Sequence, residues 1–162
     1  AFKGTDIALA AFADASRRVK DLQLIAFGTT PAFDLPPGAR YQQSPVQESL
    51  KDIYASCDAW LFASRCEGFG LPVLEAMACR TPVIATPTGA GPEVCAAGGA
   101  IEVPIEDAMK MADAIARVAD LPAAKWRELS EAAYRTSLQY DWDRSTQLFE
   151  AALTQALSSV RI

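Results

Sequence analysis

The 162-residue sequence is predicted to form a Rossmann-like α/β domain, with three layers built on a mostly parallel sheet. Three observations predict this fold class. Short apolar runs alternate with segments of helical periodicity, as in sheets whose parallel strands are connected by helices. Glycine-rich loops follow several of these runs, where α/β domains bind their ligands. Hydrophobic residues make up 51% and charged residues 22% of the chain, as expected of one globular domain over residues 1–162.

Five short segments are predicted to form strands, because they are largely apolar and are bounded by turn-forming residues. They are residues 22–27, 39–43, 59–63, 83–85 and 100–103. The brief segment 39–43 is the most edge-like of them. The runs 22–27, 59–63 and 83–85 are apolar enough to be buried strands of a parallel sheet.

Helices are predicted between these strands and over the last third of the chain, from the spacing of apolar residues. They cover residues 5–20, 47–56, the segment after Pro72, a short stretch opened by Glu93, and residues 107–119, 123–137 and 142–157. Thr5 is the expected N-cap of the first helix. The residues expected to point inward from the helix 107–119 are Met111, Ile115 and Val118.

The stretch with the clearest chemistry is the glycine loop that follows the run 59–63. Gly68 and Gly70 let a ligand approach the backbone closely, because no Cβ stands in the way. The helix start behind them offers backbone N–H groups and a positive dipole end to an anion, usually a phosphate. Glu67 and Glu75 frame the loop, and a carboxylate can accept hydrogen bonds from two neighbouring hydroxyls of a ribose or hexose. Either glutamate alone is more often a cap or a solvated residue, but the whole arrangement outlines a nucleotide-sugar site.

Three blocks of sequence resemble a known family. They are residues 67–78 (EGFGLPVLEAMA), 81–85 (TPVIA) and 89–94 (GAGPEV). Together they strongly resemble the family-4 retaining glycosyltransferases, whose GT-B architecture consists of two Rossmann-like domains. The family's E-x7-E motif falls on Glu67 and Glu75, and the resemblance extends over nearly the whole chain.

The resemblance implies that the chain is the donor-binding half of an enzyme that moves a sugar from a nucleoside-diphosphate sugar to an acceptor hydroxyl. It makes Glu67 and Lys3 the candidate catalytic residues, with Glu67 holding the donor sugar and Lys3 contacting the donor phosphates. It assigns Glu75 to the ribose hydroxyls. The other residues that it places at the donor are Gly68, Phe69, Gly70, Leu71 and Glu93.

The sequence departs from the family pattern in two places. Relatives begin with a strand that ends in Gly-Arg, and neither that strand nor its arginine is present here. The first strand is central in a doubly wound sheet, so a gap is expected beside residues 22–27. Arg80 stands where relatives have glycine, at a helix end that often requires positive φ. The acceptor is expected to bind mainly to an N-terminal domain outside this sequence, toward which the helix 142–157 would pack.

The composition limits the possible binding partners and cofactors and indicates a cellular location. The formal net charge of −5 argues against a nucleic-acid partner. The chain has no histidine, and its four cysteines match no zinc motif. The resemblance implies that neither a metal nor another cofactor is needed, because such enzymes typically work without a metal. Reduced cysteines and a cytoplasmic location are expected. Peripheral association of the full-length enzyme with a membrane is left open.

Other functions are kept as alternatives. The same fold could serve as a non-enzymatic nucleotide-binding or interaction module, and a nucleotide-binding titration on this chain would separate the glycosyltransferase from that alternative. A GT-B nucleotide-sugar epimerase or a glycogen-type phosphorylase would keep the fold and change the chemistry, and the E-x7-E block argues against both. Catalysis in the family involves two domains, so this chain alone is predicted to bind nucleotide without transferring sugar.

Overall fold

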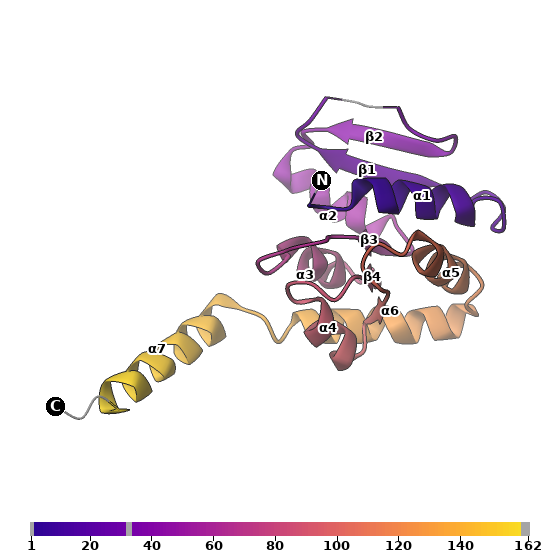
Figure 1. The fold of residues 1–162 in the computed structure, drawn as a ribbon. Coiled ribbons are helices and arrows are strands. Elements are labelled where there is room, and N and C mark those ends of the chain that lie inside the picture. The colour runs from indigo at the N-terminus through magenta and orange to yellow at the C-terminus, as the bar shows by residue number, and fades with distance from the viewer. Residues whose placement is uncertain (1, 32–33, 160–162) are drawn as a thin grey trace.

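The computed structural model describes residues 2–31 and 34–159 (Figure 1). The strands are β1 (Leu24–Gly28), β2 (Ala39–Gln43), β3 (Trp60–Phe62), β4 (Val83–Ala85) and β5 (Ala100–Glu102). The helices are α1 (Thr5–Ala15), α2 (Gln47–Ala55), α3 (Leu71–Ala78), α4 (Gly91–Ala97), α5 (Ala108–Ala119), α6 (Ala123–Ser137) and α7 (Trp142–Ser159). Strands and helices alternate through most of the chain, which confirms the predicted α/β class.

The strands form two parallel sheets. β4 lies between β3 and β5, and Ile84 is paired with Leu61 on one side and with Ile101 on the other. β1 pairs in parallel with β2, with Leu24 opposite Ala39. Parallel neighbours need crossover connections, which α3 and α4 supply in the larger sheet. The predicted parallel character of the strands is therefore confirmed.

Two apolar clusters cover the two faces of β4, which is fully buried. Ile84 belongs to the cluster formed with α1 and α5. Val83 and Ala85 belong to the cluster formed with α2, α3, α4 and α6. This alternation gives three layers and explains why the whole run is apolar. The inward residues predicted for α5 all lie in the first cluster: Met111, Ile115 and Val118.

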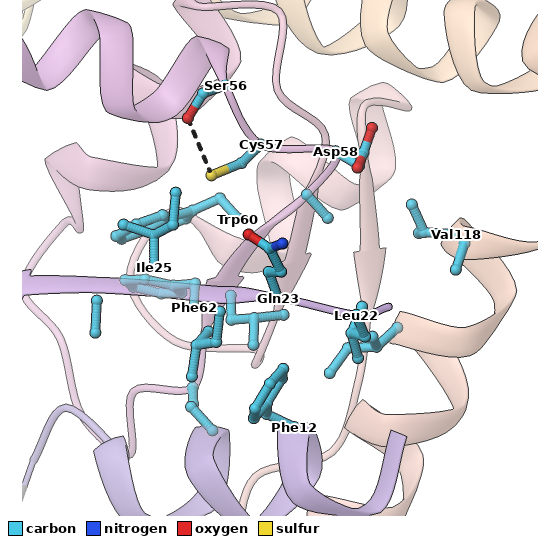
Figure 2. A pocket seen from close by; sticks show the side chains of 18 of the residues that line it. Phe12, Leu22, Gln23, Ile25, Ser56, Cys57, Asp58, Trp60, Phe62 and Val118 are labelled. Carbon is cyan, nitrogen blue, oxygen red and sulfur yellow. Dashed lines mark hydrogen bonds between the residues drawn. The ribbon is translucent and has the colours of Figure 1, made fainter. Parts of the chain in front are cut away.

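A gap separates the two sheets, between β1 and β3. The apolar run 22–27 predicted a buried strand, but every residue of β1 is only half-buried. Between the strands lies a cavity of about 1000 Å³, with Phe12 of α1 and Val118 of α5 along its wall (Figure 2). Within the described residues β1 pairs with β2 alone, which leaves its other edge on the cavity. The gap expected beside this strand is therefore present.

The end of α1 differs from the prediction. The helix ends at Ala15 and not at residue 20. The amides of Arg18 and Val19 both donate to the carbonyl of Ala15, so the chain leaves the helix in a tight turn. Asp21 then adopts a φ of 58° and turns the chain toward β1. The backbone amides of residues 16–19 satisfy the last carbonyls of α1, where a longer helix was expected.

The predicted N-cap Thr5 is wrong. Thr5 is the first helical residue, and the N-cap is Gly4, with a φ of 62°. Gly4 packs directly on the end of β3, where a Cβ would overlap the carbonyl oxygen of Ala63. Glycine alone tolerates both the positive φ and this close approach. The contact fixes the segment that carries Lys3 against the carboxyl end of β3.

Two features of the second half of the chain bear on the predictions. Arg80 has a φ of 64°, so the left-handed helix end predicted there is confirmed.

α7 extends away from the rest of the domain (Figure 1) and buries none of its residues. Its packing toward another domain stays a prediction. Over residues 2–31 and 34–159, no helix combines the length and the apolar character needed to cross a membrane.

Candidate functional site

The candidate site lies at the carboxyl ends of β3 and β4, where parallel sheets leave room for ligands. The glycine loop, residues 67–70, leads into α3, and the second loop, residues 86–90, leads into α4. Gly70 is the N-cap of α3, with no side-chain cap, and Pro72 lies in the first turn. Pro72 has no N–H, and the amide of Val73 donates to the carbonyl of Gly70 at 2.9 Å, so this start offers a ligand mainly the positive end of the helix dipole. The predicted order of strand, glycine loop and helix is therefore present.

Hydrogen bonds to main-chain carbonyls hold the second loop against the glycine loop and the segment just before it. The amide of Ala90 donates to the carbonyl of Phe69 at 2.7 Å. The hydroxyls of Thr86 and Thr88 donate to the carbonyl of Ser64 at 2.6 and 3.3 Å. Gly89, with a φ of 54°, lies so close that a Cβ there would overlap the carbonyl oxygen of Phe69. These contacts fix the backbone of both loops before any ligand binds.

The structure brings Lys3 and Glu67 together. The Lys3 ammonium lies 2.5 Å from Oε2 of Glu67, and the hydroxyl of Ser64 donates to the same oxygen at 3.3 Å. The Lys3 side chain is 67% exposed and that of Glu67 only 15%. The hydrogen bond from Lys3 is the main cause that lowers the pKa of Glu67, so the carboxylate is ionised at neutral pH. An exposed cation thus meets a largely buried anion at the start of the glycine loop.

Glu75 lies one turn into α3 and is half-buried. Its Oε2 accepts a hydrogen bond from the hydroxyl of Tyr54 at 2.9 Å. The tyrosine is fully buried, and its carbonyl accepts a hydrogen bond from Thr81 at 2.7 Å. Burial, and then the bond to Glu75, raise the pKa of Tyr54, which keeps the phenol protonated as a donor. Sequence reasoning missed this role of Tyr54. The available signal was that a buried tyrosine hydroxyl needs a partner.

Exposed apolar side chains lie on the outer side of the glycine loop. Phe69 and Leu71 are 42% and 55% exposed. The ring of Tyr140 packs edge-on against Phe69, with 6.1 Å between centroids. Burial, and then a hydrogen bond to Glu93, raise the pKa of Tyr140 to about 12. Tyr140 therefore connects the glycine loop with the first turn of α4, a contact between distant segments that sequence patterns do not reveal.

Arg65 ties three segments together behind the site. Its guanidinium donates to both carboxylate oxygens of Asp6 in α1, at 2.8 and 2.7 Å, and pairs with Glu106 beyond β5. Its backbone amide donates to the carbonyl of Phe2 at 2.7 Å. These bonds lower the pKa of Asp6 and raise that of Arg65, so the cluster stays charged over the physiological range. Sequence reasoning missed this residue, because the partners lie far apart along the chain.

The charges of the site suit an anion that also carries hydroxyl groups. The ammonium of Lys3 and the start of α3 are positive, and the carboxylates of Glu67 and Glu75 accept hydrogen bonds. Glu93 adds an exposed carboxylate in the first turn of α4. In the part of the chain that the structure describes, no group of three or more His, Cys, Asp or Glu side chains is arranged to hold a metal ion.

Comparison with known sequences identifies the family. The family model described as "Glycosyl transferases group 1" matches residues 1–120. The O-antigen chain mannosyltransferase B of Escherichia coli is 32% identical over 127 residues, which cover 76% of this chain and 31% of that protein. A D-inositol 3-phosphate glycosyltransferase of Mycolicibacterium smegmatis is 35% identical over 130 residues, 78% of this chain and 27% of that protein. The chain therefore belongs to the group 1 glycosyl transferases, and it spans about a third or less of the length of these curated relatives.

Solved structures share the fold at lower identity. The sucrose-phosphate synthase of Thermosynechococcus elongatus superposes with a TM-score of 0.76 at 22% identity, covering 98% of this chain and 43% of that chain. Anabaena Alr3699/HepE in complex with UDP and glucose superposes with a TM-score of 0.75 at 18% identity, covering 95% and 45%. At such identities the likeness shows the α/β fold, and it extends over less than half of each larger protein.

Proposed function

We propose that this chain is the donor-binding half of a family-4 retaining glycosyltransferase with the GT-B architecture. The enzyme would transfer a hexose from a nucleoside diphosphate to an acceptor hydroxyl. The observation that carries the proposal is the ion pair of Lys3 and Glu67 beside the start of α3, with Glu75 one turn further on. A cation, a helix start and two hydroxyl-binding carboxylates are the groups that a nucleotide sugar requires.

The diphosphate binds where positive charge is available. The amides of Gly68 and Gly70, the start of α3 and the ammonium of Lys3 receive its oxygens. Lys3 is mostly exposed, so its ammonium can turn from Glu67 to a phosphate. Negative charge builds on the diphosphate as its bond to the sugar breaks, and these groups stabilise that charge.

The two glutamates take the two sugars of the donor. Glu67 accepts hydrogen bonds from the transferred hexose. Glu75, which Tyr54 orients, accepts hydrogen bonds from the ribose hydroxyls. Phe69 and Leu71 offer apolar surface beside the donor, and Glu93 lies on the loop that meets its sugar end. The names of two similar proteins fit this division, because one is a mannosyltransferase and the other was solved with UDP and glucose.

The remaining parts of the proposal concern the longer protein. Relatives are at least three times as long as the part of them that this chain matches, so the acceptor is proposed to bind mainly to a separate N-terminal domain. The reaction is proposed to need no metal or other cofactor, since the charge of the leaving group is met by Lys3 and the start of α3. A cytoplasmic enzyme, peripheral to a membrane if its acceptor is a lipid, is consistent with these roles.

Nucleotide binding tests the proposal directly. Calorimetry with UDP, GDP and ADP, and with their sugar conjugates, should show binding of at least one nucleoside diphosphate. Lys3→Met should weaken that binding, because a phosphate contact is lost. Lys110→Met is the matched control, since Lys110 is an exposed lysine of α5 outside the site, and it should leave affinity unchanged. Failure of every nucleotide to bind, or equal effects of the two substitutions, would contradict the proposal.

A further inference from the structure

The phenol of Tyr54 connects the core of the domain with a carboxylate of the candidate site. Tyr54 lies in the last turn of α2 and is 2% exposed. Its hydroxyl donates to Oε2 of Glu75, one turn into α3, at 2.9 Å. The two helices pack against each other, so residues that are 21 positions apart in the sequence meet here. A group fixed in the core therefore determines where one oxygen of this carboxylate lies.

The tyrosine that makes this bond is immobilised. The rings of Phe27 and Trp60 meet its ring edge-on, with centroids 5.7 and 4.9 Å away. The hydroxyl of Thr81 donates to the carbonyl of Tyr54 at 2.7 Å, which ties the end of α2 to the turn after α3. Side chains packed in this way keep one rotamer. Burial raises the pKa of Tyr54, so the hydroxyl stays protonated and remains a donor across the physiological pH range.

The other oxygen of Glu75 is left for a ligand. The hydrogen bond from Tyr54 engages Oε2, and no described residue donates to Oε1. Buried polar atoms without a partner are uncommon, and within residues 2–31 and 34–159 the indole N–H of Trp60 is the only side-chain nitrogen or oxygen in that state. Oε1 is therefore open to solvent. The carboxylate has one oxygen held from inside the domain and one with its lone pairs available on the outside.

Two roles are compatible with this geometry. In the first, Glu75 serves the phenol, because a buried tyrosine hydroxyl needs a partner. In the second, the phenol serves Glu75, because a glutamate side chain loses rotamer freedom when a ligand fixes it, and a bond made beforehand reduces that loss. A phenylalanine in the place of Tyr54 would fill the aromatic cluster without needing a carboxylate. Packing alone therefore does not account for the hydroxyl, which favours the second role.

We infer that Tyr54 is a positioning residue, which holds the carboxylate of Glu75 so that Oε1 accepts hydrogen bonds from the vicinal hydroxyls of a ribose. An oxygen with two lone pairs can accept from the 2′ and 3′ hydroxyls together. Bonds to an ionised carboxylate are stronger than bonds between neutral groups, and they weaken when the geometry is poor. Tyr54 acts on the sugar only through Glu75. The inference rests on the proposed function, in which Glu75 binds the ribose of the donor, and adds the residue that makes this binding selective for ribose over deoxyribose.

Discrimination between ribose and deoxyribose tests this role. Calorimetry gives the Kd of UDP, GDP and ADP and of their 2′-deoxy counterparts, and the ratio of the two Kd values for one base is the ribose preference. Wild type should prefer the ribonucleotide. Tyr54→Phe keeps the ring and loses the hydroxyl, so it should reduce the ribose preference by about threefold to tenfold, the scale of one hydrogen bond.

Matched substitutions control the measurement. Tyr134→Phe removes a phenol of α6 whose ring lies under the guanidinium of Arg80, outside the candidate site, and it should leave the ribose preference unchanged. In a Glu75→Ala background, Tyr54→Phe should change the ribose preference no further, because the positioned group is gone. Glu75→Asp leaves the aromatic core intact and keeps the charge at a shorter reach. Its carboxylate cannot both meet the phenol and contact the ribose, so the ribose preference should fall by a similar factor.

A purely structural tyrosine gives a different pattern. Tyr54→Phe would then lower Tm and weaken the ribonucleotide and the deoxyribonucleotide equally, which would overturn the inference. A ribose preference in Glu75→Asp equal to that of wild type, or a further loss from Tyr54→Phe in the Glu75→Ala background, would also overturn it. So would a wild type that binds these nucleotides without any ribose preference. Failure of wild type to bind UDP, GDP or ADP at all would instead contradict the proposed function.

Discussion

Glu67 and Glu75 carry the same functional group but have different partners. Glu75 accepts from the buried phenol of Tyr54, whereas Glu67 accepts from the exposed ammonium of Lys3. We expect Glu75→Ala to weaken UDP or GDP binding by about 1–3 kcal/mol, the scale for a hydrogen bond to a charged group. Calorimetry measures the change, and an unaltered affinity would count against the ribose role.

The matched substitution is Glu67→Ala. Because Glu67 is assigned to the transferred sugar, this change should spare the binding of free nucleotide and weaken only that of the nucleotide sugar. The two titrations use the same protein preparation and so control for folding. Equal losses with both ligands would contradict the division of roles between the two glutamates.

The ion pair of Lys3 and Glu67 also predicts a dependence of stability on pH. Lys3 lowers the pKa of Glu67 from its usual 4.5. A carboxyl group with a lowered folded-state pKa stabilises the fold above its unfolded-state pKa, and this stabilisation is lost as the pH falls through the folded-state value. The Tm advantage of wild type over Glu67→Gln should therefore be small but constant near neutral pH and should shrink below about pH 4.5. Thermal melts of both proteins between roughly pH 7 and pH 3 would show it, and an advantage that grows toward low pH would contradict it.

At the scale of elements, the end of α3 combines a strained residue with favourable contacts. Arg80 has a φ of 64°, its guanidinium pairs with Glu131, and it lies 4.0 Å from the ring centre of Tyr134. The positive φ costs about 1 kcal/mol, and the two contacts together return a similar amount. Arg80→Gly should therefore leave the free energy of unfolding within about 0.5 kcal/mol of wild type.

The matched variant at this helix end is Arg80→Ala, which keeps the strain and loses the contacts. It should be about 1 kcal/mol less stable than Arg80→Gly, since the two variants differ mainly in their tolerance of positive φ. Urea denaturation of the pair measures the difference. Equal stability of the two would show that residue 80 carries no appreciable strain.

α7 is an element that the domain does not need for its own core. None of its residues is buried, and large apolar side chains such as Trp142, Phe149 and Leu157 are exposed along it. A chain that ends at residue 141 should lose less than about 1 kcal/mol of unfolding free energy, because no core contact is removed. Urea denaturation of both chains tests this, and a large loss of stability would mean that α7 packs on the domain in solution.

For the molecule as a whole, local signals predicted most elements. β4 and α6 begin after Pro82 and Pro122 and were predicted with the bounds they have, because proline and apolar spacing mark them locally. The end of α1 could not be predicted in this way. It depends on a turn of polar residues and on Asp21 at positive φ, which carry no strong local signature.

The candidate site was predictable to a smaller extent. The spacing predicted the glycine loop and its glutamates, and the resemblance supplied Lys3 as a contact of the donor phosphates; the ion pair of Lys3 with Glu67 was not predicted. The bond from Tyr54 to Glu75, the cluster around Arg65 and the contact of Tyr140 with Phe69 join segments that are distant in the sequence. Such pairs depend on the tertiary fold, so no local sequence pattern predicts them.

We propose that the chain contains the donor-binding groups but only half of a two-domain cleft, which predicts the activity of the chain on its own. The groups proposed to bind the donor lie between Lys3 and Glu93, but the chain matches less than half of each similar structure. We expect nucleotide binding with a Kd of about 0.1–1 mM, or 4–5.5 kcal/mol, and no sugar transfer. Holding two substrates in attack geometry can be worth roughly 7–11 kcal/mol, and half of a cleft does not supply it. Calorimetry and a product assay with donor and acceptor mixtures test both parts; measurable turnover would contradict the second.

The ammonium of Lys3 already holds a carboxylate when an anion reaches the glycine loop. A diphosphate that takes this ammonium exchanges one negative partner for another. Added salt screens both ion pairs, so the affinity for the diphosphate should depend less on salt than it would with an unpaired lysine. Inorganic phosphate gains little from the exchange, because Glu67 loses its cation and keeps only the weaker hydrogen bond from Ser64. With the proposed roles, a sugar nucleotide would offer hydroxyl groups to Glu67 while its phosphates bind Lys3, and the loop would thereby favour the whole donor over its fragments.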